Sequence, residues 1–305
     1  MKNRSVRLLV LVLIFALTAC GGVDLESADT VFATQTVSEA KDESGTVADT
    51  EHTPVATARP IAVEYDSDDL DPNAGNSAEA HIMLEGNSIA FEGSGATVDG
   101  ATVTITSAGI YNISGTLNDG QIMVDTKDEA TVVLILDGAD IACSTSAPIY
   151  VVNAEKTVIT LADGTENRVT DGALYILEDA VSDEPDAAIF SKDDLTINGN
   201  GSLTVNANYN NGIASKDDLK ITAGDITVNA VNDGVKGRDS IAVSYGTITI
   251  NAGGDGMQSH NDSDAEKGYI SIEGGTLNVT AGLDGIQAET RLSVSGGDVA
   301  VVSGG

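Results

Sequence analysis

The stretch NGIASKDDLKITAGDITVNA, residues 211–230, opens a pattern of polar and apolar residues that starts again three times toward the C-terminus. Asn211, Asp233, Asp255 and Asp284 each stand before a glycine and begin successive units, at spacings of 22, 22 and 29 residues. The longest unit holds an insertion near residues 260–266. A fixed period in this range is typical of a solenoid, in which each repeat packs on its neighbours.

Each unit contains three short bursts of apolar residues. In the unit that begins at Asn211 these are Ile213, then Leu219 with Ile221, then Ile226 with Val228. Short runs rich in Ile, Val and Thr and bounded by Gly, Asn and Asp predict strands with one buried face. We therefore expect an all-β fold, a right-handed parallel β-helix with three sheets and coils of about 22 residues.

Residues 98–186 keep this pattern less regularly, and we interpret them as the earlier coils. Leucine-rich repeats have a similar period but need a Leu-rich frame, which this chain lacks. The 33 glycines and the missing 3.6-residue period exclude a helical solenoid. Stacked coils place equivalent residues in columns, and Asn206, Asn229, Asn251 and Thr280 form one that favours amide-to-amide hydrogen bonds along the stack.

The N-terminus has the layout of a bacterial export signal. Lys2, Arg4 and Arg7 precede an apolar run over residues 8–17, which is too short to span a membrane, and then Leu17-Thr18-Ala19-Cys20. This end is similar to a lipobox, so residues 1–19 are predicted to be a signal peptide and Cys20 the lipidated residue. The protein is then extracytoplasmic and held at the cell membrane by the lipid alone.

Residues 20–81 predict a disordered acidic tether, because they are rich in Ala, Ser, Thr, Asp and Glu with almost no apolar periodicity. Residues 82–305 are then the β-helix domain. The register calls for a further coil after Gly305 and no closing cap is visible, so we expect that either a partner covers this end or the C-terminus is incomplete. After removal of the signal, Cys143 is a single thiol that cannot form an internal disulfide.

The chain is strongly acidic, with 15 Lys and Arg against 47 Asp and Glu and a net charge of −32. Loss of the three cations of the signal peptide would bring this to −35. Nucleic acid is excluded as a partner, because phosphate binding needs a basic surface. A surface of this charge repels further copies of itself and recruits cations, so we expect a monomer.

Several phrases resemble a clostridial family of carbohydrate-binding-domain lipoproteins. They cover residues 110–117, 133–138 and 146–150, together with the Ser-Lys-Asp-Asp-Leu phrases that begin at Ser191 and Ser215. The resemblance runs over about residues 82–305. It implies a parallel β-helix similar in shape to pectate lyases, bound Ca²⁺, and affinity for plant cell-wall polysaccharide such as polygalacturonate and cellulose. No catalytic activity is firmly attached to this family.

Metal-ligand candidates lie at the unit starts, where Asn211, Asp233, Asp255 and Asp284 should stack at one corner. Ca²⁺ takes six to eight oxygens from carboxylates, amides and carbonyls. Asp217 and Asp239 are two more candidates, in the next column along the chain. The alternative is that Asp-Gly is only a turn signal whose carboxylate accepts nearby backbone amides.

A second column contains cations: alignment of the units puts Lys192, Lys216, Arg238 and His260 in register, with Lys236 two residues from Arg238. Such a column could bind the carboxylates of an extended polyuronate while adjacent acids hold Ca²⁺. The alternative is a solvated salt-bridge ladder, because exposed pairs contribute little individually.

We expect noncatalytic, calcium-dependent binding of cell-wall polysaccharide at the cell surface. The alternatives are a calcium-dependent pectate lyase, with Lys216, Lys236 or Arg238 as base, and a structural adhesin. The neighbouring acids would raise a lysine pKa, which argues against such a base. There is no Trp, and Tyr209, Tyr245 and Tyr269 could either stack on sugar rings or pack within turns.

Overall fold

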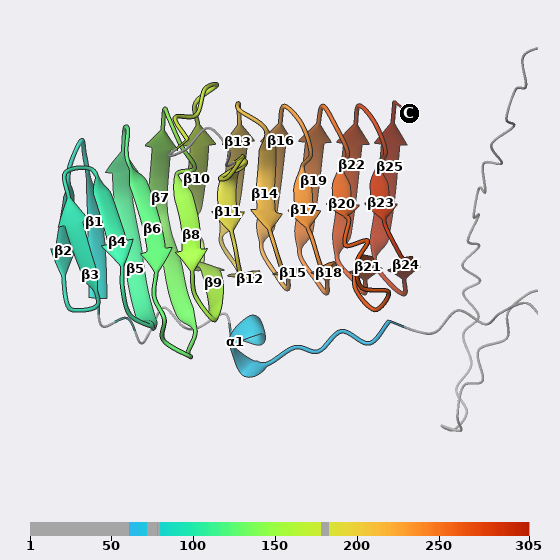
Figure 1. Cartoon of the computed structure of the whole chain (residues 1–305), viewed down its shortest axis with the longest axis horizontal. Coiled ribbons are helices and arrows are strands. Elements are labelled where there is room, and N and C mark those ends of the chain that lie inside the picture. The colour runs from blue at the N-terminus through green and yellow to red at the C-terminus, as the bar shows by residue number, and fades with distance from the viewer. Residues whose placement is uncertain (1–60, 72–77, 79, 178–182, 305) are drawn as a thin grey trace, which may run out of the picture. The chain divides into compact units, whose positions relative to one another are not determined.

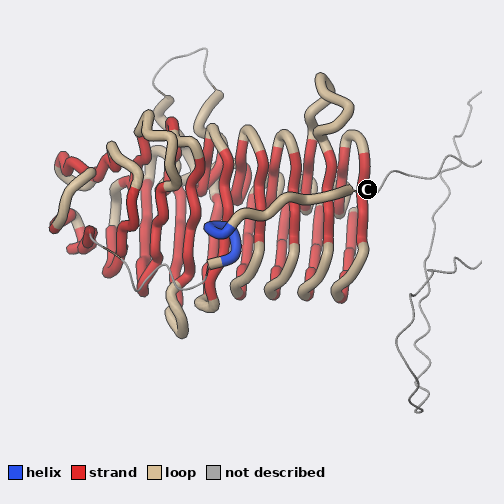
Figure 2. The backbone as a smooth tube through the Cα atoms, turned by 90° about the horizontal axis from the view of Figure 1, so that it is seen from below, coloured by secondary structure: helices blue, strands red, loops and turns tan. Residues whose placement is uncertain are grey.

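The computed structural model describes residues 61–71, 78, 80–177 and 183–304. Over these residues the chain is almost entirely β-strand, wound into a stack of coils (Figures 1 and 2). The predicted all-β solenoid of parallel strands is therefore confirmed. Cys20 and the signal peptide lie outside the described residues. No helix in the described part is long and apolar enough to cross a membrane.

Three rows of parallel strands run along the stack, and we name each by one of its members. The β14 row is a nine-stranded sheet made of β3 Ala96–Asp99, β4 Thr102–Ile105, β6 Gln121–Asp125, β8 Ile149–Asn153, β11 Ala187–Ser191, β14 Asn211–Ser215, β17 Val235–Gly237, β20 Met257–Ser259 and β23 Ile286–Ala288. The β15 row contains β9 Lys156–Leu161, β12 Asp194–Gly199, β15 Asp218–Ile221, β18 Ser240–Val243, β21 Tyr269–Ile272 and β24 Arg291–Val294. The β16 row contains β10 Glu166–Asp171, β13 Ser202–Ala207, β16 Asp225–Ala230, β19 Thr247–Ala252, β22 Thr276–Ala281 and β25 Asp298–Ser303.

Hydrogen bonds join the β15 and β16 rows into one sixteen-stranded sheet. The junction is β7 (Val132–Cys143), whose first half pairs with β9 and whose second half pairs with β10. β5 (Gly109–Leu117) and β1 (Ala80–Gly86) continue this sheet, and β2 (Ile89–Glu92) closes it as an antiparallel partner of β1. The sequence predicted three separate sheets. In the structure β7 continues unbroken around one corner, so its hydrogen bonds to β9 and β10 join two of the three rows into one sheet.

The register follows the repeat written in the sequence. Ile213, Val235, Met257 and Ile286 are direct partners along the β14 row, so the insertion near residue 260, which lengthens its unit from 22 to 29 residues, leaves the pairing unchanged. The inward residues of each row form one continuous apolar core, in which most side chains are fully buried. Each fully buried aliphatic side chain stabilises the fold by roughly 1.5–3 kcal/mol.

A segment assigned to the tether in the sequence analysis is folded against the β15 row. We call residues 61–71 the strap; it contains α1 (Ser67–Leu70) and crosses several coils (Figure 2). A capping box forms the helix start, because Asp66 accepts the amides of Asp68 and Asp69 and Asp69 accepts the amide of Asp66. The described part of the fold thus includes the strap and β1 from Ala80, ahead of the predicted boundary at residue 82.

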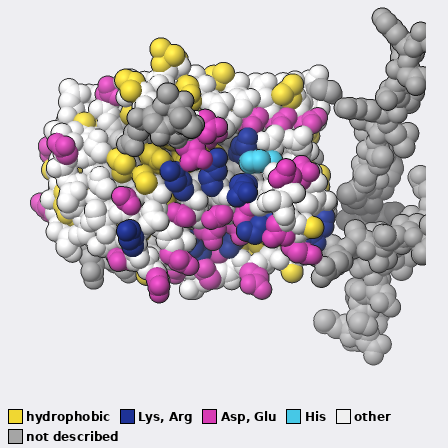
Figure 3. Space-filling model, in the orientation of Figure 1, with side chains coloured by type: hydrophobic (Ala, Val, Ile, Leu, Met, Phe, Trp, Pro, Cys, Tyr) yellow, Lys and Arg dark blue, Asp and Glu magenta, His cyan; other side chains and the backbone are white. Residues whose placement is uncertain are grey.

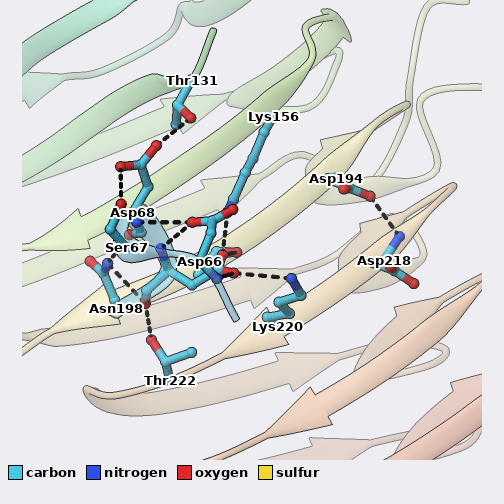
Figure 4. Close-up of polar contacts among 12 residues, drawn as sticks. Asp66, Ser67, Asp68, Thr131, Lys156, Asp194, Asn198, Asp218, Lys220 and Thr222 are labelled. Atoms are coloured by element: carbon cyan, nitrogen blue, oxygen red, sulfur yellow. Dashed lines mark hydrogen bonds and ion pairs between the residues drawn. The ribbon is translucent and has the colours of Figure 1, made fainter. Parts of the chain in front are cut away.

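The strap is held by a fully buried carboxylate, that of Asp69. Figure 4 shows Lys156 and Lys220 pointing from their strands toward the strap residues around it. The Asp69 carboxylate lies 2.5 Å from Lys156 Nζ and 3.0 Å from Lys220 Nζ, and it accepts a 2.6 Å hydrogen bond from the Thr196 hydroxyl. Burial favours the neutral acid, but the hydrogen bonds from Lys156, Thr196 and Lys220 outweigh it and lower the pKa of Asp69. The acidic strap therefore folds against the coils because lysines from two of them neutralise its buried carboxylate.

The strap makes further contacts on both sides of this carboxylate. Asp68 accepts a 2.6 Å hydrogen bond from Thr131, and the Tyr65 hydroxyl donates to Glu273 at 3.2 Å. The strap thus links coils that do not touch one another.

We expect Asp69→Ala to lower the free energy of unfolding by about 3 kcal/mol, because at a buried site it removes the carboxylate that pairs with Lys220 and one of the two that pair with Lys156. Equilibrium unfolding in urea measures this loss. Asp163→Ala, which removes an exposed carboxylate from the turn between β9 and β10, is the control and should change stability by less than about 0.5 kcal/mol. Equal unfolding midpoints for the two variants would show that the strap does not stabilise the domain.

Candidate functional site

Cations gather on the outer side of the β14 row, just past the strand ends. The Lys216 amide bonds to the carbonyl of Ser191, and the Arg238 amide bonds to the carbonyl of Ser215, so the positions of Lys192, Lys216 and Arg238 stack in register. We call these three residues the cation stripe. Figure 3 shows Lys and Arg side chains clustered on this face beside a histidine, with acids around them. The structure therefore brings the predicted column together.

Lys236 and His260 extend the cation stripe. Lys236 pairs with Ala214 and Gln258 along the row, and its Nζ lies 3.5 Å from Asp233 Oδ2. His260 follows Arg238 in the column. Burial, and after it the charges of Lys236, Lys216 and Arg238, lower the pKa of His260. A neutral imidazole therefore lies among three cations at neutral pH.

Two carboxylates that sequence reasoning missed reach the same face. Glu184 lies 2.8 Å from Lys216 Nζ and 3.6 Å from Lys192 Nζ. Asp186 accepts a 3.1 Å hydrogen bond from the Asn211 amide, and burial raises its pKa. Both residues belong to the long connection before β11, outside the repeat, so no periodic signal could have found them.

The two lysines that Glu184 contacts keep more than a third of their side chains exposed, 38% for Lys192 and 36% for Lys216.

An aromatic pair and a cleft lie at the β8 end of the cation stripe. The rings of Tyr150 and Phe190 meet edge to face at 5.7 Å, with Lys192 Nζ 5.9 Å from the Tyr150 centroid. The cleft has a volume of about 460 Å³ and is lined by Tyr150, Lys192, Glu184, Gln121 and Ser146 among others. It offers a cation, a ring edge and amide and hydroxyl groups to one ligand.

The two predicted metal ligands of the adjacent column, Asp217 and Asp239, interact with each other. Burial and the charge of Asp239 raise the pKa of Asp217 to about 6. Burial also opposes ionisation of Asp239, but hydrogen bonds from Lys267 and Asn261 outweigh it and lower its pKa. At neutral pH both carboxylates are largely ionised, so Lys267 neutralises only one of the two negative charges and close to one remains.

The other four predicted metal ligands form what we call the backbone-capping ladder, in which a side-chain oxygen of one residue accepts the backbone amide of the equivalent residue in the next coil. Asn211, Asp233 and Asp255 each accept the amide of the next unit's first residue through a side-chain oxygen, at 3.2, 2.9 and 2.9 Å, and Asp284 is the last of these donors. The second oxygen of Asp255 accepts Gln258 at 2.7 Å. Within the described residues, no group of three or more His, Cys, Asp or Glu side chains could hold a metal ion. The predicted Ca²⁺ therefore stays a prediction.

The turn tyrosines differ in their surroundings. Tyr209 stacks on Tyr175 at 4.0 Å, and Tyr269 packs against Arg291. Tyr245 is exposed over 69% of its surface. Only Tyr245 of the three therefore presents a largely open ring.

Comparison with known proteins gives three findings. The family model for "carbohydrate-binding domain-containing protein" matches residues 99–305. A curated relative with the same description, from Acetivibrio thermocellus, is 54% identical over 136 residues, which are 45% of this chain and 48% of the relative, so the match spans about half of that protein's length. A solved structure described as the polysaccharide lyase-like protein from C. thermocellum, gadolinium derivative, is 44% identical with a TM-score of 0.67, covering 74% of this chain and 96% of that one.

We expect Asp217→Asn to raise the melting temperature at pH 7 in metal-free buffer. The folded protein holds the Asp217 proton up to a pH of about 6, above the ordinary value of 3.8, so ionisation of this group costs folding free energy as the pH rises from 4 through 6. The advantage of the variant should therefore shrink as the pH falls from 7 to 4. Asp262→Asn, at an exposed loop carboxylate, is the control and should follow the parent at every pH.

Proposed function

We propose, from the premise that this chain belongs to the carbohydrate-binding domain-containing protein family, that it binds polysaccharide without catalysis and that the cation stripe contacts acidic polymers. Family membership and the likeness to a polysaccharide lyase-like protein support polysaccharide as the ligand. The observation that carries the finer proposal is the stacking of Lys192, Lys216 and Arg238 on one face.

The cation stripe has the chemistry that a polyuronate such as polygalacturonate requires. Equivalent residues on successive coils lie about 4.8 Å apart, so an extended chain along the stack meets one cation per coil. Glu184 already lies 2.8 Å from Lys216, which is a favourable carboxylate contact within the same chain. Three cations together offset the repulsion that the net charge of −32 exerts on an acidic ligand.

We propose that Ca²⁺ joins the protein and the ligand at Asp217 and Asp239. The raised pKa of Asp217 supports this, because a divalent cation beside the two carboxylates would relieve their repulsion. Two protein carboxylates are too few for the six to eight oxygens that Ca²⁺ takes, so ligand carboxylates and water would supply the rest. Asp233 and Asp255 of the backbone-capping ladder are less suited, since their carboxylate oxygens already accept hydrogen bonds.

A lyase is the alternative, and one observation favours it: His260 is a neutral base among the cations. Its Nδ1 atom is buried without a hydrogen-bond partner in the described structure, so that nitrogen cannot reach a polymer on the surface. Lys192 is no better as a base, because contacts with Tyr150 and Glu184 outweigh burial and raise its pKa. We therefore favour binding, and absence of unsaturated products after incubation with polygalacturonate tests this choice.

We also propose that the protein is exported and held at the cell surface by a lipid on Cys20. The charged head, the short apolar run and the Leu17-Thr18-Ala19-Cys20 end support this. A location outside the cytoplasm agrees with a polysaccharide ligand. A right-handed winding is part of the same proposal, since crossovers between parallel strands are right-handed in nearly all proteins.

Replacing the cation stripe, Lys192→Gln with Lys216→Gln and Arg238→Gln, should weaken polygalacturonate binding by about tenfold or more. Each exposed contact contributes up to about 1 kcal/mol, and contacts along one polymer combine. Affinity electrophoresis measures the loss, and added salt should reproduce it in the parent. The control is Lys127→Gln with Arg168→Gln, two exposed cations elsewhere on the coils. Equal binding by the stripe variant and the parent would refute the assignment.

Millimolar Ca²⁺ should raise the melting temperature of the parent relative to chelator, and more so with polygalacturonate present. An ion that binds only the folded state at a hundred times its Kd adds about 2.7 kcal/mol. The double variant Asp217→Asn with Asp239→Asn should lose the shift, whereas Asp284→Asn should keep it. Coincident melting curves of the parent in Ca²⁺ and in chelator would remove Ca²⁺ from the proposal.

A further inference from the structure

One carboxylate of the chain already pairs with two of the three cations of the cation stripe. Glu184 Oε1 lies 2.8 Å from Lys216 Nζ, and Glu184 Oε2 lies 3.6 Å from Lys192 Nζ. The two lysines belong to adjacent coils, because the Lys216 amide bonds to the carbonyl of Ser191. A single carboxylate thus bridges two cations that the proposed function assigns to two sugar carboxylates of a polyuronate.

The backbone on the C-terminal side of Glu184 is fixed to the face that carries the stripe. Pro185 is buried, and Asp186 accepts a 3.1 Å hydrogen bond from the side-chain amide of Asn211. The strand β11 begins at the next residue, Ala187. The Glu184 carboxylate is therefore held beside the lysines at an effective concentration on the order of millimolar or more, against which any external carboxylate must compete.

Aromatic rings support the two lysines independently of Glu184. Lys192 Nζ lies 5.9 Å from the centroid of the Tyr150 ring, on the preceding coil. Lys216 Nζ lies 5.9 Å from the centroid of the Phe190 ring. Such contacts between an ammonium group and a ring face are attractive, so both cations keep their positions when the carboxylate leaves. Because 24% of the Glu184 side chain is exposed, a ligand from solution can reach this contact.

Arg238, the third member of the stripe, differs from the two lysines. It is exposed, and it forms no ion pair with any other residue that the structure describes. An acidic polymer therefore contacts Arg238 without displacing an internal partner. Once one sugar is bound there, the next carboxylates of the same polymer reach the lysines at an effective concentration comparable with that of Glu184.

We propose that Glu184 is an internal competitor of the cation stripe: it pairs with the two lysines in the free protein, and the linked carboxylates of an acidic polymer that first contacts Arg238 displace it. This inference rests on the proposed function, because it concerns the regulation of the same site. In a chain with a net charge of −32, an unpaired stripe would attract the acidic surface of other copies. The internal carboxylate limits that association and also limits the affinity for acidic ligands.

The test is the variant Glu184→Gln, which keeps the shape of the side chain and removes its charge. It should strengthen binding of the full chain to polygalacturonate by about three- to tenfold, since the ligand no longer displaces two exposed ion pairs. Affinity electrophoresis at low salt measures the gain, and added salt should reduce it. Glu166→Gln is the matched control, because it removes the same charge from an exposed position on β10, in a different row of strands, and should bind as the parent does.

A double-mutant comparison distinguishes competition from a general effect of charge. With Lys192→Gln and Lys216→Gln already in place, Glu184→Gln should change polygalacturonate binding by less than about twofold, because the cations for which the carboxylate competes are gone. Melting curves of all variants exclude unfolding as the cause of any loss of binding. Glu184→Ala provides a second replacement of the carboxylate and should give the same gain as Glu184→Gln.

The outcomes separate this inference from the proposed function. If the parent binds polygalacturonate and Glu184→Gln binds it equally or more weakly, internal competition is refuted and the stripe remains the proposed site. A gain that persists without the two lysines refutes it as well. Binding by Glu184→Gln alone supports the inference, since the internal carboxylate then prevents detectable binding in the parent. If neither protein binds polygalacturonate, both the inference and the proposed function fail.

Discussion

Parallel pairing of each coil with the next is the constraint on which the rest of the structure depends. Residues that pair once, such as Ile213 with Val235, pair again one coil later with Met257, because backbone hydrogen bonds fix the step along the stack. An inward residue thereby continues the core, and an outward residue continues a surface column. Whatever chemistry one coil presents, the next presents about 4.8 Å away.

This repetition explains why the surface is divided into faces of different chemistry. The β14 row presents Lys192, Lys216 and Arg238, while β13, β16, β19 and β22 of the β16 row present Thr and Asn columns in which Asp225 is the single acid. A polymer has the same repeating character, so many weak contacts along it combine into useful affinity. Cationic and largely neutral columns therefore lie on separate rows of strands.

The strap provides a coupling that coil-to-coil pairing cannot. In a solenoid each coil contacts only its neighbours, so stability is approximately a sum of local terms. Asp69 binds Lys156 and Lys220, which belong to different coils, and a buried carboxylate between two lysines strongly favours the bound position. Val133, Ile135 and Val158 form a small apolar cluster on the outer side of the same sheet, against which Ala78 packs. Within the described residues, the strap and Ala78 therefore cover part of the outer side of this sheet.

The sequence by itself determined the coil repeat, the strand register and the column of Lys192, Lys216 and Arg238. It could do so because a chain of equal units contains its own alignment, and parallel pairing turns that alignment into neighbours in space. The tertiary structure alone decided where the strap binds, since Asp69 and Lys220 are 151 residues apart and share no repeat. It also decided that Glu184 contacts the stripe and that the carboxylates of Asp233 and Asp255 accept backbone amides. These contacts depend on side-chain geometry between segments that no periodicity relates, so a sequence pattern carries no trace of them.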